Sequence, residues 1–169
     1  MDFERIYFDM DGVLVDFNGG VMDMFQIDAG NQEDPGREEL DDRMFAAIAA
    51  MPHFYLKLKP IEGTLDILKE LIPRYGSRVE ILTGVPKPFR KVYTAAEDKT
   101  EWVREYVSKD IVVNAVLRRE KMQFARGPGS ILIDDMKMNI REWTEAGGTG
   151  IIFTGPEDLR RTLSEMDIL

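Results

Sequence analysis

The sequence predicts an α/β fold: a Rossmann-like parallel sheet of about five strands flanked by helices, with a small, partly helical insertion after the first strand. Short apolar runs rich in β-branched and aromatic residues recur along the chain, and each ends at polar residues or glycine. The segments between most of these runs carry apolar residues at helical spacing. Strands that alternate with helices in this way build a parallel sheet with right-handed crossovers.

Five apolar runs supply the predicted strands. They are residues 6–8, 79–82, 115–117, 130–133 and 150–153. The third run is the weakest of the five. Near-continuous apolar runs are typical of strands that are buried on both faces, as in a parallel sheet covered by helices.

A helix is predicted between the first two strands because Leu65 and Leu68 begin a stripe at helical spacing. Thr64 is the expected N-cap, Pro73 is expected to end or kink the helix, and Gly76 lies beyond its end. Further helices are predicted around residues 102–107, 140–144 and 156–166.

The insertion breaks the alternation because it contains no clear strand. It holds Gly19-Gly20, a polar loop at 28–37 and an alanine-rich segment around 44–51. The predicted domains are therefore a core of residues 1–17 and 59–169 and a small cap insertion of residues 18–58.

Composition narrows the classes of function. A chain of 169 residues is one domain by length, and 44% hydrophobic with 31% charged residues is ordinary globular composition. With 31 acidic and 22 basic residues the formal net charge is −9. A field of that sign repels nucleic acid and anionic membranes, so we predict no duplex nucleic acid partner. A small phosphorylated substrate needs local positive charge from a metal or a lysine.

The residue types present also limit the chemistry. The absence of cysteine excludes disulfides and thiolate metal sites. We interpret the single histidine, His53, as a partly buried packing residue and not a catalytic one. No apolar run approaches the roughly 18 residues that span a bilayer. The charged start of the chain lacks the order of a signal peptide. We therefore expect a cytoplasmic protein without a membrane partner.

Acidic pairs follow two of the predicted strands. Asp9 and Asp11 come after the first strand, and alternation along an extended chain directs them to the same side. Asp134 and Asp135 follow the fourth strand. Ligands bind open parallel sheets beyond the carboxyl ends of the strands, and clustered carboxylates are costly unless a cation compensates them. A Mg²⁺ site is the functional interpretation, and helix caps or turns are the structural alternative.

Other candidates are weaker when each is taken alone. Thr83-Gly84 follows the second strand and can hold a phosphate oxygen or simply form a turn. Lys121 can neutralise a phosphate or lie in solvent. Three aromatic residues flank the insertion and either pack its core or wall a substrate: Phe17, Phe54 and Tyr55. Four further cations are interpreted as solvated surface residues: Lys87, Arg90, Lys91 and Lys99.

In chain order these motifs resemble the four-motif set of the haloacid dehalogenase (HAD) superfamily, and within it the 5′(3′)-deoxyribonucleotidase family. The order is Asp-x-Asp-Gly, Thr, Lys and Asp-Asp. The stretches that carry the family resemblance are residues 9–17, 53–63, 81–89, 99–103 and 131–135. The resemblance spans nearly the whole chain apart from residues 18–50.

That resemblance implies a Mg²⁺-dependent phosphomonoesterase acting on (deoxy)nucleoside monophosphates. Asp9 would be the nucleophile that becomes an aspartyl-phosphate, and Asp11 the general acid and base. Mg²⁺ would be held by the Asp9 carboxylate, the Asp11 backbone carbonyl and Asp135, with Asp134 orienting Asp135 or a metal-bound water. The implied substrate- and phosphate-binding residues are Asp11, Gly12, Phe17, Thr83, Gly84 and Lys121.

Departures and alternatives concern the substrate more than the reaction. The family's Thr-Ser pair is Thr83-Gly84 here, and the segment after Phe17 is shorter and lacks the Phe-Trp pair that contacts the base. A phosphatase of another small metabolite is therefore one alternative. A receiver-type signalling domain is another, although its motifs follow a different order, and a non-catalytic binding module would leave four carboxylates uncompensated. A homodimer is a further hypothesis.

Overall fold

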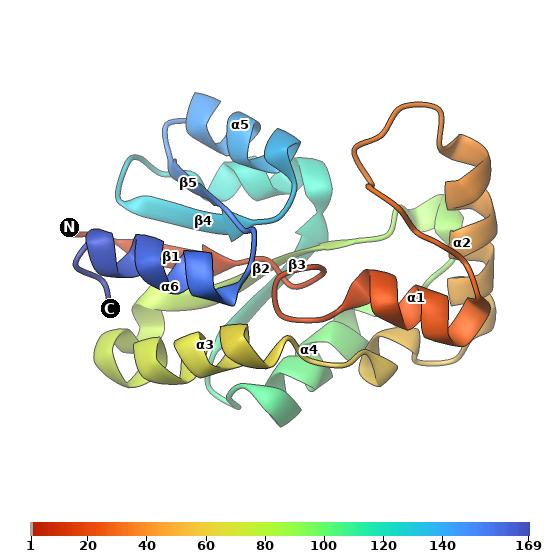
Figure 1. Ribbon diagram of the computed structural model, residues 1–169, viewed down its shortest axis with the longest axis horizontal. Helices are drawn as coiled ribbons and strands as arrows, with labels where there is room; N and C mark the ends of the chain where they lie inside the picture. The colour runs from red at the N-terminus through yellow and green to blue at the C-terminus, as the bar shows by residue number, and fades with distance from the viewer. Residues whose placement is uncertain (1) are drawn as a thin grey trace.

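The computed structural model describes residues 2–169 and contains one five-stranded sheet. Its strands are β1 (Arg5–Phe8), β2 (Val79–Val85), β3 (Val112–Leu117), β4 (Ser130–Asp134) and β5 (Thr149–Ile152). They pair in the order β3-β2-β1-β4-β5, and every pairing is parallel. The predicted Rossmann-like α/β fold is confirmed (Figure 1). All five strands lie where the sequence predicted them, but β2 and β3 are longer than their predicted ranges of 79–82 and 115–117.

Helices cover both faces of the sheet. The α-helices are α1 (Phe17–Phe25), α2 (Glu38–Ala50), α3 (Glu62–Tyr75), α4 (Ala95–Tyr106), α5 (Lys137–Glu145) and α6 (Pro156–Glu165). The short 3-10 helices are η1 (Phe54–Lys57), η2 (Gly76–Arg78), η3 (Pro88–Arg90) and η4 (Arg118–Phe124). No helix among residues 2–169 has the length and apolar character that crossing a bilayer requires.

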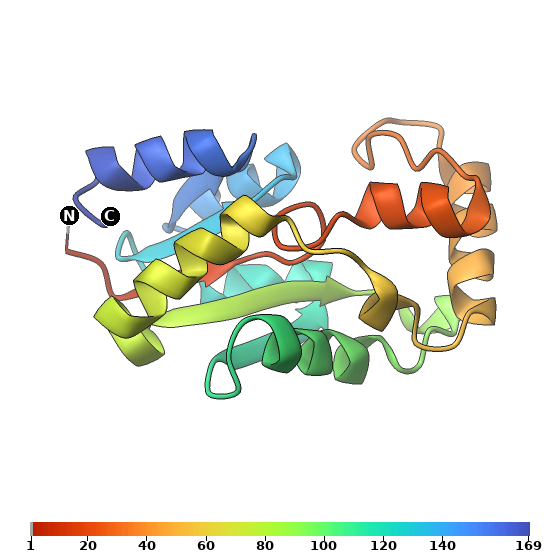
Figure 2. The same ribbon diagram turned by 60° about the horizontal axis from the view of Figure 1, so that its bottom comes forward.

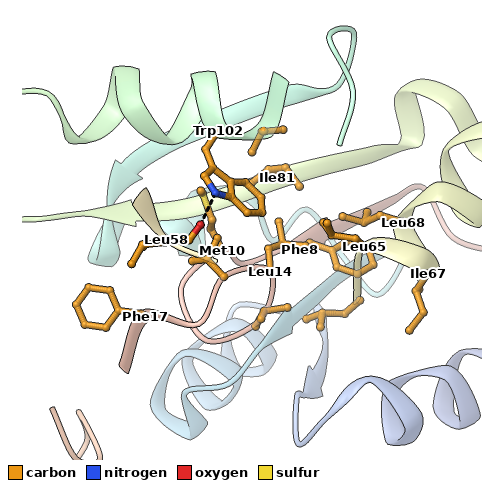
Figure 3. Packing of buried hydrophobic residues seen from close by; sticks show 14 of the residues in the cluster. Phe8, Met10, Leu14, Phe17, Leu58, Leu65, Ile67, Leu68, Ile81 and Trp102 are labelled. Carbon is orange, nitrogen blue, oxygen red and sulfur yellow. Dashed lines mark hydrogen bonds between the residues drawn. The ribbon is translucent and has the colours of Figure 1, made fainter. Parts of the chain in front are cut away.

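Alternation along the strands produces a separate apolar core on each face. Ile6 and Phe8 of β1 join the larger cluster, which also contains buried residues of α3, α4 and α6. Tyr7, between them in sequence, belongs to the smaller cluster with Trp143 of α5. Figure 3 shows part of the larger cluster, including Phe8 of β1 and Leu65 and Leu68 of α3.

Two details of α3 differ from the prediction. The helix begins at Glu62, because the carbonyl of Ile61 already accepts from the amides of Thr64 and Leu65. Thr64 is therefore a buried residue of the first turn and not the N-cap. Pro73 lies inside the helix and does not end it. The last turn persists because the Tyr75 ring packs on Phe3 and its hydroxyl donates to the carbonyl of Ile168 at 2.9 Å.

The insertion projects from one end of the sheet. In Figures 1 and 2 the helices α1 and α2 and the loop between them lie beyond the ends of β1 and β2. The order of the strands changes direction at β1. The strands β2 and β3 are added on one side of β1, whereas β4 and β5 are added on its other side, so the switch point lies between β1 and β4. The carboxyl ends of strands at such a switch point form the usual ligand crevice of open α/β sheets.

Candidate active site

The turn after β1 brings Asp11 back toward Asp9. The amide of Asp9 still donates to the carbonyl of Ile133 at 2.9 Å, which ties it to β4. The Met10 carbonyl then accepts from the amides of the residues that follow, including Leu14 at 2.8 Å, so the chain curls tightly. Asp9 is 6% exposed. Both aspartates line the same cavity.

Gly12 is required at its position by both conformation and space. Its φ of +79° lies in the left-handed region that side chains disfavour. A Cβ built there would overlap the carboxylate of Asp135. The absence of a side chain at residue 12 therefore lets the loop after β1 approach the end of β4.

Lys121 bridges the acidic ends of β1 and β4. Its Nζ donates to Asp9 Oδ1 at 2.7 Å and to Asp134 Oδ2 at 2.9 Å. Asp134 is fully buried and also accepts from the Asn139 side-chain amide and the Met136 backbone amide, both at 2.9 Å. Burial alone would lower the pKa of Lys121, but the carboxylates of Asp9 and Asp134 outweigh it and raise that pKa. Lys121 is thus held as a buried cation.

Three of the predicted metal-binding aspartates form one cluster. Asp9, Asp134 and Asp135 each offer a carboxylate oxygen, and these oxygens lie within 4.8 Å of one another. Burial and the neighbouring Asp134 raise the pKa of Asp9 to about 7. Burial and the charges of Asp9 and Asp134 raise the pKa of Asp135 to about 8. Such a cluster is compensated by a hard cation with oxygen ligands, and Mg²⁺ fits that donor set.

Lys99 is the main residue of the site that the sequence analysis placed wrongly. It was interpreted as a surface lysine, but α4 carries it into the sheet edge and it is 0% exposed. Its Nζ donates to Asp11 Oδ2 at 2.7 Å, Thr83 Oγ1 at 3.0 Å and the Gly84 carbonyl at 2.7 Å. The sequence does contain a signal for this burial. Lys99 lies three and four residues before Trp102 and Val103, so all three share the buried face of α4.

The cavity next to these groups has a volume of about 280 Å³. Its lining includes Asp9, Asp11, Phe17, Gln32, Asp41, Phe45, Tyr55, Gly84, Lys87, Phe89, Arg118 and Lys121. Phe17 and Tyr55 are buried residues that also line the cavity, whereas Phe54 is buried in the core of the insertion. Thr83 is fully buried, and the cavity lining includes its neighbour Gly84 but not Thr83 itself. The wall therefore mixes aromatic rings with charged and amide side chains that come from the insertion and from segments around it.

Two contacts hold the insertion over this cavity. Glu33 accepts from the backbone amides of Lys137 and Met138, at 3.0 and 2.6 Å, and so caps the start of α5. Arg90 pairs with Asp42 of α2 at 2.5 Å and lies over the Phe45 ring, 5.0 Å from its centroid. Arg90 is thus a contact residue and not a freely solvated cation, while Lys87 and Lys91 are exposed as predicted.

The return from the insertion is tied to α4. The Trp102 indole donates to the Leu58 carbonyl at 2.9 Å, as Figure 3 shows. His53 is exposed, whereas the sequence predicted a partly buried packing residue. Its side chain is 57% exposed, and Nδ1 lies 2.8 Å from the buried carboxylate of Asp98. Asp98 also accepts from the Thr94 hydroxyl. His53 therefore anchors the end of the insertion to the core.

Comparisons with known proteins agree with this arrangement. The family model described as 5′ nucleotidase, deoxy (pyrimidine), cytosolic type C protein matches residues 4–165. A human 5′(3′)-deoxyribonucleotidase, cytosolic type, is 30% identical over 147 residues, covering 78% of this chain and 70% of its own. A HAD family hydrolase from Deinococcus radiodurans, solved with bound phosphate and sodium, has a TM-score of 0.53 at 18% identity, covering 99% and 98% of the two chains. A HAD family enzyme from Bacteroides thetaiotaomicron, solved as a magnesium complex, has a TM-score of 0.51 at 15% identity, covering 96% and 99%.

Proposed function

Because the chain belongs to the family of 5′ nucleotidase, deoxy (pyrimidine), cytosolic type C proteins, a family of HAD-type phosphatases, we propose that it hydrolyses (deoxy)nucleoside monophosphates through an aspartyl-phosphate. The observation that carries the proposal is the meeting of Asp9, Asp11 and Lys121 at one wall of a cavity of about 280 Å³. Phosphoryl transfer depends mainly on positioning and on neutralising charge, and these residues supply both.

In this mechanism Asp9 attacks phosphorus and Asp11 handles the proton. Attack by the Asp9 carboxylate breaks the ester bond, and Asp11 protonates the departing alkoxide. Asp11 then removes a proton from the water that hydrolyses the aspartyl-phosphate. Lys121 has three N–H donors, and the two carboxylates use two of them, which leaves one for a phosphoryl oxygen. Thr83 and the Gly84 backbone are assigned to the phosphate as well.

The acidic cluster fits a magnesium ion. Asp9, Asp135 and the backbone carbonyl of Asp11 would hold it, with Asp134 orienting the site through its bonds to Lys121 and Asn139. Bound there, Mg²⁺ neutralises charge on the phosphoryl group and on the clustered carboxylates. The raised pKa values of Asp9 and Asp135 and the close packing of Gly12 on Asp135 support this assignment.

The remaining assignments follow from the same architecture. We propose that residues 18–58 act as the cap that selects the substrate and residues 1–17 and 59–169 as the catalytic core, because Gln32, Asp41, Phe45 and Tyr55 of the cap line the cavity. A cytoplasmic location is supported by the cytosolic type of the human relative. A homodimer stays a hypothesis that sedimentation of the purified protein tests.

Phosphate release from a substrate panel tests the proposed function. Deoxynucleoside 5′- and 3′-monophosphates, ribonucleotides and sugar phosphates are compared with Mg²⁺ and with a chelator. We expect nucleotides to be hydrolysed only with Mg²⁺, and Asp9→Asn to reduce turnover to background while the exposed control Asp66→Asn keeps it. Preference for a sugar phosphate would move the chain to the alternative substrate class. No release from any ester would refute the phosphatase mechanism.

A further inference from the structure

Lys99 is surrounded by oxygen atoms from three residues at the carboxyl ends of β1 and β2. They are Asp11 Oδ2 at 2.7 Å, Thr83 Oγ1 at 3.0 Å and the Gly84 carbonyl at 2.7 Å. A lysine ammonium has three N–H donors and no acceptor, so these three oxygens use its whole capacity. Lys99 consequently has no donor left for a phosphoryl oxygen, in contrast to Lys121.

The remaining side of the ammonium faces an aromatic ring. Nζ lies 4.6 Å from the centroid of Tyr55, within the range of a cation–π contact. Tyr55 belongs to η1, at the end of the insertion, and lines the cavity. A lysine that is 0% exposed is therefore fully satisfied without substrate, which makes its geometry a fixed property of the fold.

The two oxygens of Asp11 have different surroundings because of Lys99. Oδ2 accepts from Lys99, whereas Oδ1 is buried without a hydrogen-bond partner among residues 2–169. An unpartnered buried oxygen is costly unless a ligand meets it. Asp11 lines the cavity, so a group bound there can supply that partner.

The bond to Thr83 has a similar consequence. Because Lys99 donates to Thr83 Oγ1, the hydroxyl uses an acceptor lone pair on the lysine and keeps its own hydrogen for another acceptor. One ammonium thus orients both the Asp11 carboxylate and the Thr83 hydroxyl. Asp11 Oδ1 and the hydroxyl hydrogen of Thr83 therefore stay available for other partners while Lys99 is bound.

We propose that Lys99 is a positioning residue for proton transfer by Asp11, fixing Oδ2 so that Oδ1 exchanges the proton. This inference rests on the phosphatase mechanism proposed above. In the first step the Asp9–phosphorus bond forms, the ester bond breaks, and the proton of Asp11 Oδ1 moves to the departing oxygen. In the second step a water oxygen bonds to phosphorus, the Asp9–phosphorus bond breaks, and the water proton returns to Oδ1. Lys99 exchanges no proton in either step.

The dependence of rate on the leaving group tests this role. An alkyl alcohol, as in a deoxynucleoside monophosphate, needs a proton to depart, whereas 2,4-dinitrophenolate leaves without one. Positioned general acid catalysis contributes about 10²–10⁴-fold. We therefore expect Lys99→Met to lower kcat at least about 100-fold for the nucleotide and less than about 10-fold for 2,4-dinitrophenyl phosphate.

Lys121→Met is the matched control. Lys121 is an equally buried lysine that contacts Asp9 and Asp134 instead of Asp11, so its loss should lower kcat by similar factors for both esters. Equal losses for both esters in Lys99→Met would overturn the proposal, as would full activity with both. Absence of hydrolysis by the unmodified protein would instead refute the proposed function itself.

Restoring the amine provides a second measurement. The chain contains no cysteine, so Lys99→Cys followed by aminoethylation installs a lysine-like ammonium at one site only. We expect the modified protein to regain the nucleotide reaction, while the unmodified cysteine variant shows the leaving-group dependence of Lys99→Met. If Lys99→Met does not fold, this pair replaces it. Recovery of both esters by the same factor would refute the positioning role.

Discussion

Magnesium binding should release protons, because the pKa values of two carboxyl groups in the proposed metal site, those of Asp9 and Asp135, are raised. Burial together with neighbouring carboxylates raises the pKa of Asp9 to about 7 and that of Asp135 to about 8. Metal ligands must be deprotonated, so binding at neutral pH displaces these protons. The two groups lie in one cluster, and the quantity to compare with experiment is therefore their total rather than either assignment.

The expected number follows from the two pKa values. At pH 7 the pair formed by Asp9 and Asp135 retains protons, because the two pKa values are about 7 and about 8, so saturating Mg²⁺ should release roughly one proton or more. At pH 9, above both pKa values, the proton release should be much smaller than at pH 7. Affinity for Mg²⁺ should rise over the same interval, because fewer protons compete.

Calorimetric titration of Mg²⁺ in buffers of different ionisation enthalpy measures the proton count directly. Asp135→Asn should lower both the count at pH 7 and the affinity. The control Asp158→Asn should change neither, because Asp158 is a half-exposed residue outside the acidic cluster, and its pKa is lowered by Thr154 and Arg161. A release near zero at pH 7, or one that does not change between pH 7 and 9, would show that these carboxylates are not the metal ligands.

The other predictions concern stability, the loop after β1 and the cap contact. Without metal, the free energy of unfolding should fall as pH rises from about 4 to 8. The raised pKa values of Asp9 and Asp135 make the native state bind more protons than the unfolded chain in that pH range. Urea titrations at several pH values measure this change. Gly12→Ala should weaken Mg²⁺ binding at least about 10-fold by displacing Asp135, unlike Gly76→Ala, which has positive φ but open space. Glu33→Ala removes the contact between the insertion and α5 and should raise KM about 10-fold with little change in kcat, because hydrogen bonds to a charged group are worth about 1.5–3 kcal/mol. The control Glu39→Ala should leave KM unchanged.

The sheet was predictable because its signal is local and strong. Buried parallel strands are apolar on both faces, so the runs at Ile6–Phe8 and Ile131–Ile133 stand out in the sequence without knowledge of their partners. The strand order brings Asp9 and Asp134 together, and the rule that ligands bind beyond the carboxyl ends of strands anticipates this meeting. What the sequence lacked was the extent of β2 and β3, whose ends depend on pairing.

The errors arose where tertiary contacts override a local preference. Lys99 follows two acidic residues on a helix, and a charged run of this kind usually faces solvent. Its burial depends on oxygens that Asp11, Thr83 and Gly84 supply from distant positions. Glu33 belongs to a polar loop with no periodic pattern, so nothing in its neighbourhood indicated a contact with α5.

Charge balance at the sheet edge connects the two buried lysines with the metal. Four carboxylates meet there, Asp9, Asp11, Asp134 and Asp135, and Lys99 and Lys121 each pair with members of this group. Four negative and two positive formal charges leave a charge of −2, which one divalent cation or about two protons would cancel. The two carboxyl groups with raised pKa values, Asp9 and Asp135, are the ones that can take up those protons, and both lie in the proposed metal site. Proton uptake and metal binding are therefore alternative solutions to the same excess of charge, and a substrate phosphate, which adds further negative charge, requires the metal solution.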